Sequence, residues 1–280
     1  MRESSNPIFR SLPKQQGGYA QFGTGVAGAA QQVGYQTQPY TTRAPQTGVS
    51  RPLTIDDVVT KTGITLGVLS AVAVISYYLV SANVALAMPF TLVGALGGLA
   101  LVLIATFGRK QDNPAIVLSY AALEGLFLGA ISFLIANFTV SGTSAGALIG
   151  QAILGTIGVF FGMLVVYKTG AIRVTPKFTR MLVASMIGAL VLMLGNAVIS
   201  MFGSHDGGPL RNGGTAAIIF SLVMIVIAAF CFLLDFDSAD QMIRAGAPEK
   251  AAWGIALGLT VTLVWLYLEI LRLLSYFQQR

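Results

Sequence analysis

Seven long apolar stretches between residues 61 and 276 constrain this chain more than any other feature. Crossing the hydrocarbon core of a bilayer takes about 20 residues of helix, and each stretch is close to that length. Backbone amides in lipid must find their partners within the segment, so each stretch is expected to be a helix. The sequence therefore predicts an all-α membrane protein, a seven-transmembrane-helix bundle. The predicted spans are residues 61–81, 84–107, 114–136, 144–167, 181–202, 215–236 and 255–276.

Composition supports a lipid environment and excludes several kinds of site. Charged residues make up 10% of the chain, whereas a soluble domain carries about 25%. A chain so poor in charge cannot cover a surface that faces water. The single cysteine, Cys231, excludes an internal disulfide framework, and the single histidine, His205, excludes a multi-histidine metal site. No resident metal or organic cofactor is expected.

Residues 1–50 differ from the rest of the chain. They are rich in Gly, Gln, Thr and Ala and have no apolar period, so they bury too little apolar surface to offset the entropy of ordering. We expect a disordered N-terminal tail over 1–50 and a seven-helix transmembrane domain over 51–280. Thr54 and Asp57 have the spacing of a capping box at the start of the first helix.

Basic residues are distributed unevenly between the two sides of the predicted bundle. Fourteen of the 17 Lys and Arg residues lie in the tail and in the second, fourth and sixth loops. The first and third loops have none, and the fifth has Arg211 alone. The positive-inside rule then predicts a cytoplasmic N-terminus and an outside C-terminus, in the cell (inner) membrane. The net charge of +6 is explained by topology and anionic lipid, so no nucleic-acid partner is expected.

Glycine pairs occur at the spacing that lets membrane helices approach closely. We expect most of these GxxxG pairs to serve packing within one chain, and the protein to be a monomer. The pairs are Gly94–Gly98, Gly125–Gly129, Gly146–Gly150, Gly158–Gly162 and Gly254–Gly258.

Three acidic residues, Glu124, Asp235 and Glu269, lie within or at the edge of the spans, and Arg272 follows one turn after Glu269. An ionisable group in hydrocarbon costs at least about 2.5 kcal/mol, so each should face the bundle interior, find a partner or line water. One interpretation is an internal ion pair or hydrogen bond that sets helix packing. The other is a proton or cation site. Because three acids have one nearby base, the charges do not balance, which favours the second interpretation.

The surroundings of Asp235 distinguish it from the acids that follow. Apolar residues flank it in the run CFLLDFDSADQMI (231–243), whereas Asp237 and Asp240 are typical of a solvated helix end. Asp237 remains a secondary candidate for pairing or for lining a path. Glu124 lies about ten residues into its span, and we expect it to line the path near Glu269 or Arg272.

Two runs near the C-terminus resemble a known family. The last span reads LYLEILRLL (266–274), and the sixth ends in Asp235-Phe236. This combination, with the third-span run NPAIVLSYAALEGLFLGAIS (113–132), resembles the transmembrane Bax inhibitor motif (Bax inhibitor-1) family over residues 51–280. Within the family it looks most like a bacterial, actinobacterial-type branch.

The resemblance implies a fold in which the last helix is central and the other six surround it. It also implies a pH-sensitive calcium leak, sensed by a carboxyl pair between the sixth and seventh helices, which here would be Asp235 and Glu269. Two carboxyls in contact share a proton, and its loss adds repulsion that opens the contact. Calcium would then be the permeant ion, with transient binding at this pair.

Contact between the pair depends on where the seventh helix begins. We expect residues 238–254 to form a cytoplasmic helical cap, so that the span begins near Leu257 and Glu269 lies near mid-depth. A start at Ala251 would instead place Glu269 about 27 Å along the helix, far from Asp235.

Two other function classes are considered. A regulator that binds another membrane protein, such as a protease, would use the tail and the 238–254 segment as docking surfaces. An intramembrane enzyme lacks the necessary motifs, since neither zinc ligands nor the GxSG or GxGD signatures are present. We therefore expect no catalytic residue.

Overall fold

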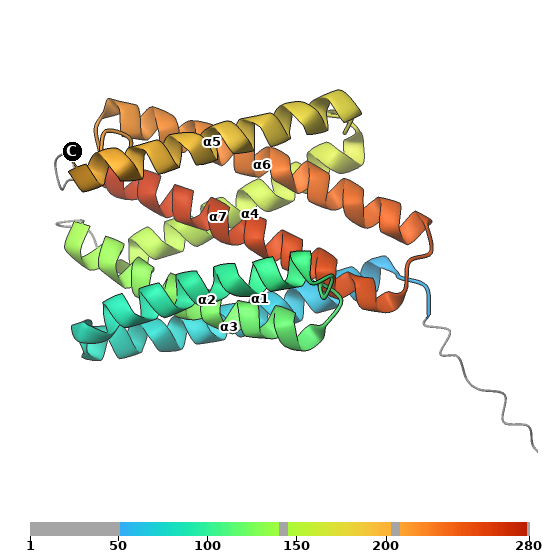
Figure 1. Ribbon diagram of the computed structural model, residues 1–280, viewed down its shortest axis with the longest axis horizontal. Coiled ribbons are helices and arrows are strands. Elements are labelled where there is room, and N and C mark those ends of the chain that lie inside the picture. The colour runs from blue at the N-terminus through green and yellow to red at the C-terminus, as the bar shows by residue number, and fades with distance from the viewer. Residues whose placement is uncertain (1–50, 140–144, 203–207, 279–280) are drawn as a thin grey trace, which may run out of the picture. The chain divides into compact units, whose positions relative to one another are not determined.

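The computed structural model describes residues 51–139, 145–202 and 208–278 (Figure 1). The predicted tail, residues 1–50, lies outside these ranges, as does His205. The account below concerns the described ranges.

Within these ranges the chain forms seven α-helices, each long and apolar enough to cross a membrane, as predicted. The described connections include 3-10 turns at Val84–Leu86 and Glu249–Ala251 and a π-helical turn at Ile135–Thr139. The protein is thus an all-α, multi-pass membrane protein. The helices are α1 (Ile55–Ala82), α2 (Ala87–Phe107), α3 (Pro114–Leu134), α4 (Ala145–Thr169), α5 (Pro176–Phe202), α6 (Thr215–Arg244) and α7 (Ala252–Gln278).

Capping residues explain where two of the helices begin. The Asp57 amide donates to the Thr54 hydroxyl at 3.4 Å, and the Thr54 amide donates to Asp57 at 3.0 Å, which confirms the predicted capping box. Asn113 caps α3 by accepting from the Ala115 amide at 2.9 Å, with Pro114 at the first helical position. Both devices satisfy amide groups that a helix N-terminus would otherwise leave without partners.

The last helix is the centre of the bundle, as the family resemblance implied. α7 packs against α1, α3, α4 and α6, and it lies between the group α1–α2–α3 and the helices α5 and α6 (Figure 1). The largest apolar cluster brings α7 residues such as Leu266 and Leu271 together with Phe232 of α6 and Leu148 of α4. Because α7 touches both helix groups, a side chain on it is well placed to couple them.

Three of the five GxxxG pairs serve packing within the chain. Gly125 and Gly129 of α3 lie against the backbone of α1, and Gly94 and Gly98 of α2 lie against α3. Gly254 and Gly258 of α7 face Gln111 and Asp235. The two pairs on α4, Gly146–Gly150 and Gly158–Gly162, have no atom within 4 Å of where a side chain would begin. The prediction of internal packing is therefore right for α2, α3 and α7 and wrong for α4.

The predicted cap over residues 238–254 is wrong. α6 continues as one helix to Arg244, and α7 begins at Ala252. The polar stretch after Asp235 stays helical because its side chains pair along the helix, as in the 2.8 Å bridge between Arg244 and Asp240. The short turn between the helices is held by the segment before α1, where the Leu53 amide donates to Ala247 at 2.8 Å and the Glu249 amide donates to Arg51 at 2.9 Å.

Candidate functional site

Asp235 lies on α6 and faces α7. Its carboxylate accepts a hydrogen bond from the Thr262 hydroxyl at 2.7 Å, and Gly258, one turn earlier on α7, leaves room for it. The same hydroxyl lies 3.2 Å from the Gly258 carbonyl. The acid is thus held by a polar contact between two spans whose other contacts are largely apolar.

A small cavity of about 120 Å³ leads to Asp235 from one end of the bundle. We call this the basic end; it carries the turns at 108–113, 170–175 and 245–251. Asp112, in the turn before α3, lines the same cavity and forms a long ion pair with Lys250 at 3.8 Å. The other lining residues are Gln111, Ser238, Met242, Ala251, Gly254, Ile255 and Gly258.

Glu269 lies deeper along α7 and is 1% exposed. Its Oε1 is 3.0 Å from the Arg272 guanidinium, one turn on, and 3.4 Å from that of Arg211, which precedes α6. Ser221 of α6 lies close to the same carboxyl. The Tyr276 hydroxyl donates to the Arg211 carbonyl at 3.3 Å, which further ties this segment to α7.

The structure does not bring Asp235 and Glu269 together. Asp235 meets Thr262, which precedes Glu269 by seven residues, or about 10 Å along an α-helix. The register follows from the uninterrupted helices on both sides of the 245–251 turn. α6 continues to Arg244, nine residues past Asp235, and the returning α7 reaches Thr262 ten residues after its start at Ala252. The early start of α7, which would separate the two acids, is the one observed.

The remaining candidates occupy separate places. Glu124 lies between α3 and α2, with the Tyr120 hydroxyl 3.5 Å away and Gly98 opposite its carboxyl. It makes no hydrogen bond or ion pair with Glu269 or Arg272 in the described ranges, so the expected proximity is not observed. Asp237 accepts from Gln241 at 2.6 Å on the exposed side of α6.

The family of this chain follows from a match to a family model. Residues 6–279 match the family model described as Bax inhibitor 1 like. The chain belongs to this family. A search of curated proteins finds no match to the chain.

Membership in the Bax inhibitor 1-like family fits the seven spans and confirms the resemblance drawn from LYLEILRLL and Asp235-Phe236. The match starts at residue 6, so it includes most of the tail that the motifs had left out. It does not distinguish branches of the family, and the actinobacterial-type branch remains a prediction.

The charges of the three acids in the spans are compensated very differently. Glu269 has two arginines beside it, whereas neither Asp235 nor Glu124 forms an ion pair with a described residue. No group of three or more His, Cys, Asp or Glu residues converges within the described ranges. Asp112 and Asp235 are the two carboxylates that line the cavity at the basic end.

Sequence reasoning missed three residues of this arrangement. Arg211 had been counted only as a loop charge, although a lone base on a side otherwise almost free of bases was a signal of pairing with a buried acid. Thr262 offered a weak signal, because it is one of few hydroxyl residues in the apolar part of α7. Asp112 gave no signal, because its place beside Asp235 depends on the packing of the turn before α3 against α6 and α7.

Proposed function

We propose that this family member is a pH-sensitive cation leak, with calcium as the permeant ion, in the cell membrane with its N-terminus in the cytoplasm. The observation that carries the proposal is Asp235, a carboxyl inside the membrane-spanning bundle that has a hydroxyl partner but no basic one among the described residues. It lies at the end of a cavity that opens at the basic end. The protein is proposed to catalyse no reaction and to need no bound cofactor.

The proton on Asp235 is the proposed control. When the carboxyl is protonated it is neutral, and its hydrogen bond with Thr262 holds α6 against α7. Loss of the proton leaves a partly buried carboxylate with no basic partner in the described ranges, and such a charge requires water or a cation beside it. Raising the pH therefore favours hydration of the cavity and passage of a cation. This mechanism uses one titrating acid and does not need contact between Asp235 and Glu269.

Glu269 has a different role in this proposal. Held by Arg211 and Arg272, it fixes the far half of α7 against the segment before α6 and closes the path at that end. Glu124, between α2 and α3, stays a secondary candidate for lining the path.

The test is calcium uptake into dye-loaded liposomes containing the purified protein, measured from about pH 6 to pH 8. The wild-type rate should rise with pH. Asp235→Asn keeps the shape and the hydrogen bond with Thr262 but cannot ionise, so its rate should no longer depend on pH. Asp237→Asn, two residues away on the exposed side of α6, is the matched control and should keep the wild-type profile. A wild-type pH profile in Asp235→Asn would overturn the mechanism, and absence of protein-dependent uptake at every pH would overturn the leak itself.

A second role, binding and modulating another membrane protein such as a protease, is favoured by α5. Its principal packing partner is α6, and most of its apolar side chains, including Ile187, Leu190 and Leu194, face outward. Such a loosely packed span could receive a helix of a partner protein. Crosslinking through photoreactive residues on α5 in native membranes would yield a discrete protein adduct if this role is correct, and lipid adducts alone if it is not.

A further inference from the structure

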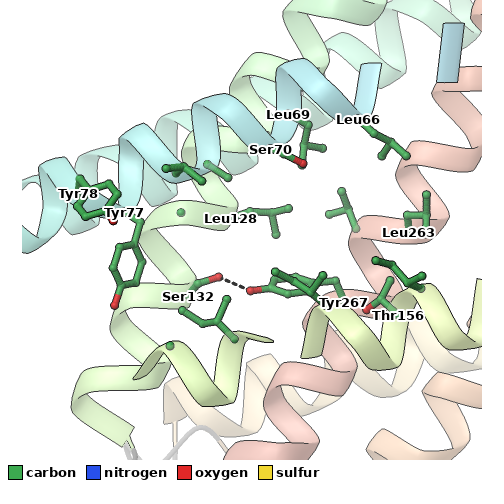
Figure 2. A pocket seen from close by; sticks show the side chains of 18 residues that line it. Leu66, Leu69, Ser70, Tyr77, Tyr78, Leu128, Ser132, Thr156, Leu263 and Tyr267 are labelled. Carbon is green, nitrogen blue, oxygen red and sulfur yellow. Dashed lines mark hydrogen bonds between the residues drawn. The ribbon is translucent and has the colours of Figure 1, made fainter. Parts of the chain in front are cut away.

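A large cavity, separate from the acids, lies between α1, α3, α4 and α7 (Figure 2). Its volume is about 480 Å³, within the range of about 300–1,000 Å³ common for ligand pockets. Apolar side chains form most of its wall, including Leu66 and Leu69 of α1, Leu128 of α3 and Leu263 of α7. A cavity of this size with a mostly apolar wall is suited to an apolar ligand.

One hydrogen bond crosses the floor of this cavity. Ser132 of α3 and Tyr267 of α7 are joined hydroxyl to hydroxyl at 2.8 Å (Figure 2). The Thr156 hydroxyl on α4 donates to the carbonyl of Ala152 in its own helix at 2.8 Å. These three hydroxyls already have partners, so the part of the cavity next to them offers water little. The other hydroxyls of the lining, those of Ser70, Tyr77 and Tyr78, lie on the α1 wall.

The mouth of the cavity is continuous with the lipid-facing surface of the bundle. Four lining residues, Val74 and Tyr78 of α1 and Ile153 and Ile157 of α4, are at least 45% exposed. α4 packs mainly against α6 and α7, and no extensive contact with α1 closes the space between the two helices. Both helices are membrane spans, so this mouth faces the hydrocarbon of the bilayer.

We propose that this cavity binds one acyl chain of a membrane phospholipid, which enters between α1 and α4 and ends against the Ser132–Tyr267 pair. A void of this size would deprive its lining atoms of dispersion contacts, and the surrounding bilayer supplies a flexible apolar chain that restores them. The site also has a consequence for α7, because Tyr267 lies two residues before Glu269. A bound chain fills the space between α4 and α1 and supports the position of the central helix from the side.

Gly146 makes a sharp test available. It lines the cavity, and nothing lies within 4 Å of where its Cβ would stand, so Gly146→Phe fills the space without overlap at the backbone. Gly162→Phe is the matched control: it adds the same ring on the same helix, also with open space, but Gly162 does not line the cavity. Ser70→Phe fills the cavity from the α1 wall and serves if Gly146→Phe does not fold.

The experiment uses full-length protein in nanodiscs that contain a phospholipid with a photoreactive diazirine in its acyl chain, with adducts mapped by mass spectrometry. Wild type should be labelled preferentially on peptides from 66–78 and 149–157. Gly146→Phe should reduce that labelling about tenfold, which corresponds to about 1.4 kcal/mol of lost binding free energy. Gly162→Phe should leave it unchanged.

Two results would overturn the proposal. The first is equal labelling of all lipid-facing helices together with no effect of either cavity-filling variant. The second is weak labelling of these peptides in a wild-type dimer that rises when the dimer dissociates to monomer in size-exclusion chromatography with light scattering, because a second copy of the chain would then cover the cavity.

Discussion

At the scale of single residues, the acids Glu269 and Asp235 differ in how their charge is compensated inside the membrane-spanning bundle. Glu269 has opposite charges within 3.0 and 3.4 Å, so its carboxylate is compensated by protein groups. Asp235, by contrast, has the Thr262 hydroxyl at 2.7 Å as its one polar side-chain partner in the part of the chain that the structure describes. The first arrangement suits a structural role, since breaking a buried ion pair is strongly destabilising. The second suits a group whose charge changes during function.

Arg211 should therefore matter for stability although it lies outside the helices. Arg211→Gln removes one of the two charges that compensate Glu269 while Arg272 stays 3.0 Å from the carboxylate, so the cost is smaller than the about 3–5 kcal/mol of a buried charge left with no partner. We expect a clear fall in the thermal unfolding midpoint of the purified protein in detergent. Arg173→Gln is the control, because Arg173 is exposed in the turn between α4 and α5 and forms no ion pair with a described residue. Equal midpoints for the two variants would contradict this account.

At the scale of helices, the apolar stretches predicted the spans well because spanning lipid imposes the same length on every segment. The capping box at Thr54 was also predictable, since it depends on residues three apart. The α6–α7 register was not. The register depends on how far the polar stretch after Asp235 stays helical before the chain turns. Contacts from a distant segment, such as the hydrogen bond from Leu53 to Ala247, decide where that turn lies. The same error placed Glu269 too close to Asp235 in the prediction.

The packing of α1 on α3 depends on a glycine that tolerates no side chain. A Cβ at Gly129 would overlap the Ala73 carbonyl oxygen and lie 2.6 Å from the Ser76 Cβ, so backbone or side-chain atoms would have to move. Overpacking of this kind costs about 1–3 kcal/mol, and Gly129→Ala should lower the thermal midpoint in detergent. Gly158→Ala on α4 meets open space and should be neutral or slightly stabilising, because alanine favours helix by up to about 1 kcal/mol. Equal destabilisation by both substitutions would show that α1–α3 packing is not limiting.

At the scale of the whole molecule, the two ends of the bundle differ in how much basic charge they expose, in the same sense as the loop charges of the sequence. The bases at the end opposite the basic end include Arg211 and Arg272, and both have Glu269 as an ionic partner. Their side chains are 20% and 22% exposed, so they present little free charge to the surface. At the basic end, by contrast, the Arg173 and Lys250 side chains are largely exposed. The positive-inside rule then predicts that the basic end lies in the cytoplasm.

This orientation is tested with a reporter that fluoresces only in the cytoplasm. Fused after Arg280, beyond all seven helices, it should give no signal, because α7 runs from the basic end to the other side. Fused to a chain truncated after Gly246, in the turn that follows α6, it should fluoresce, because an even number of spans returns the chain to the side of its N-terminus. A periplasm-active alkaline phosphatase at the same two positions should give the opposite pattern and controls for poor expression. Cytoplasmic fluorescence from the Arg280 fusion would reverse the orientation, and the cavity leading to Asp235 would then sense the pH outside the cell.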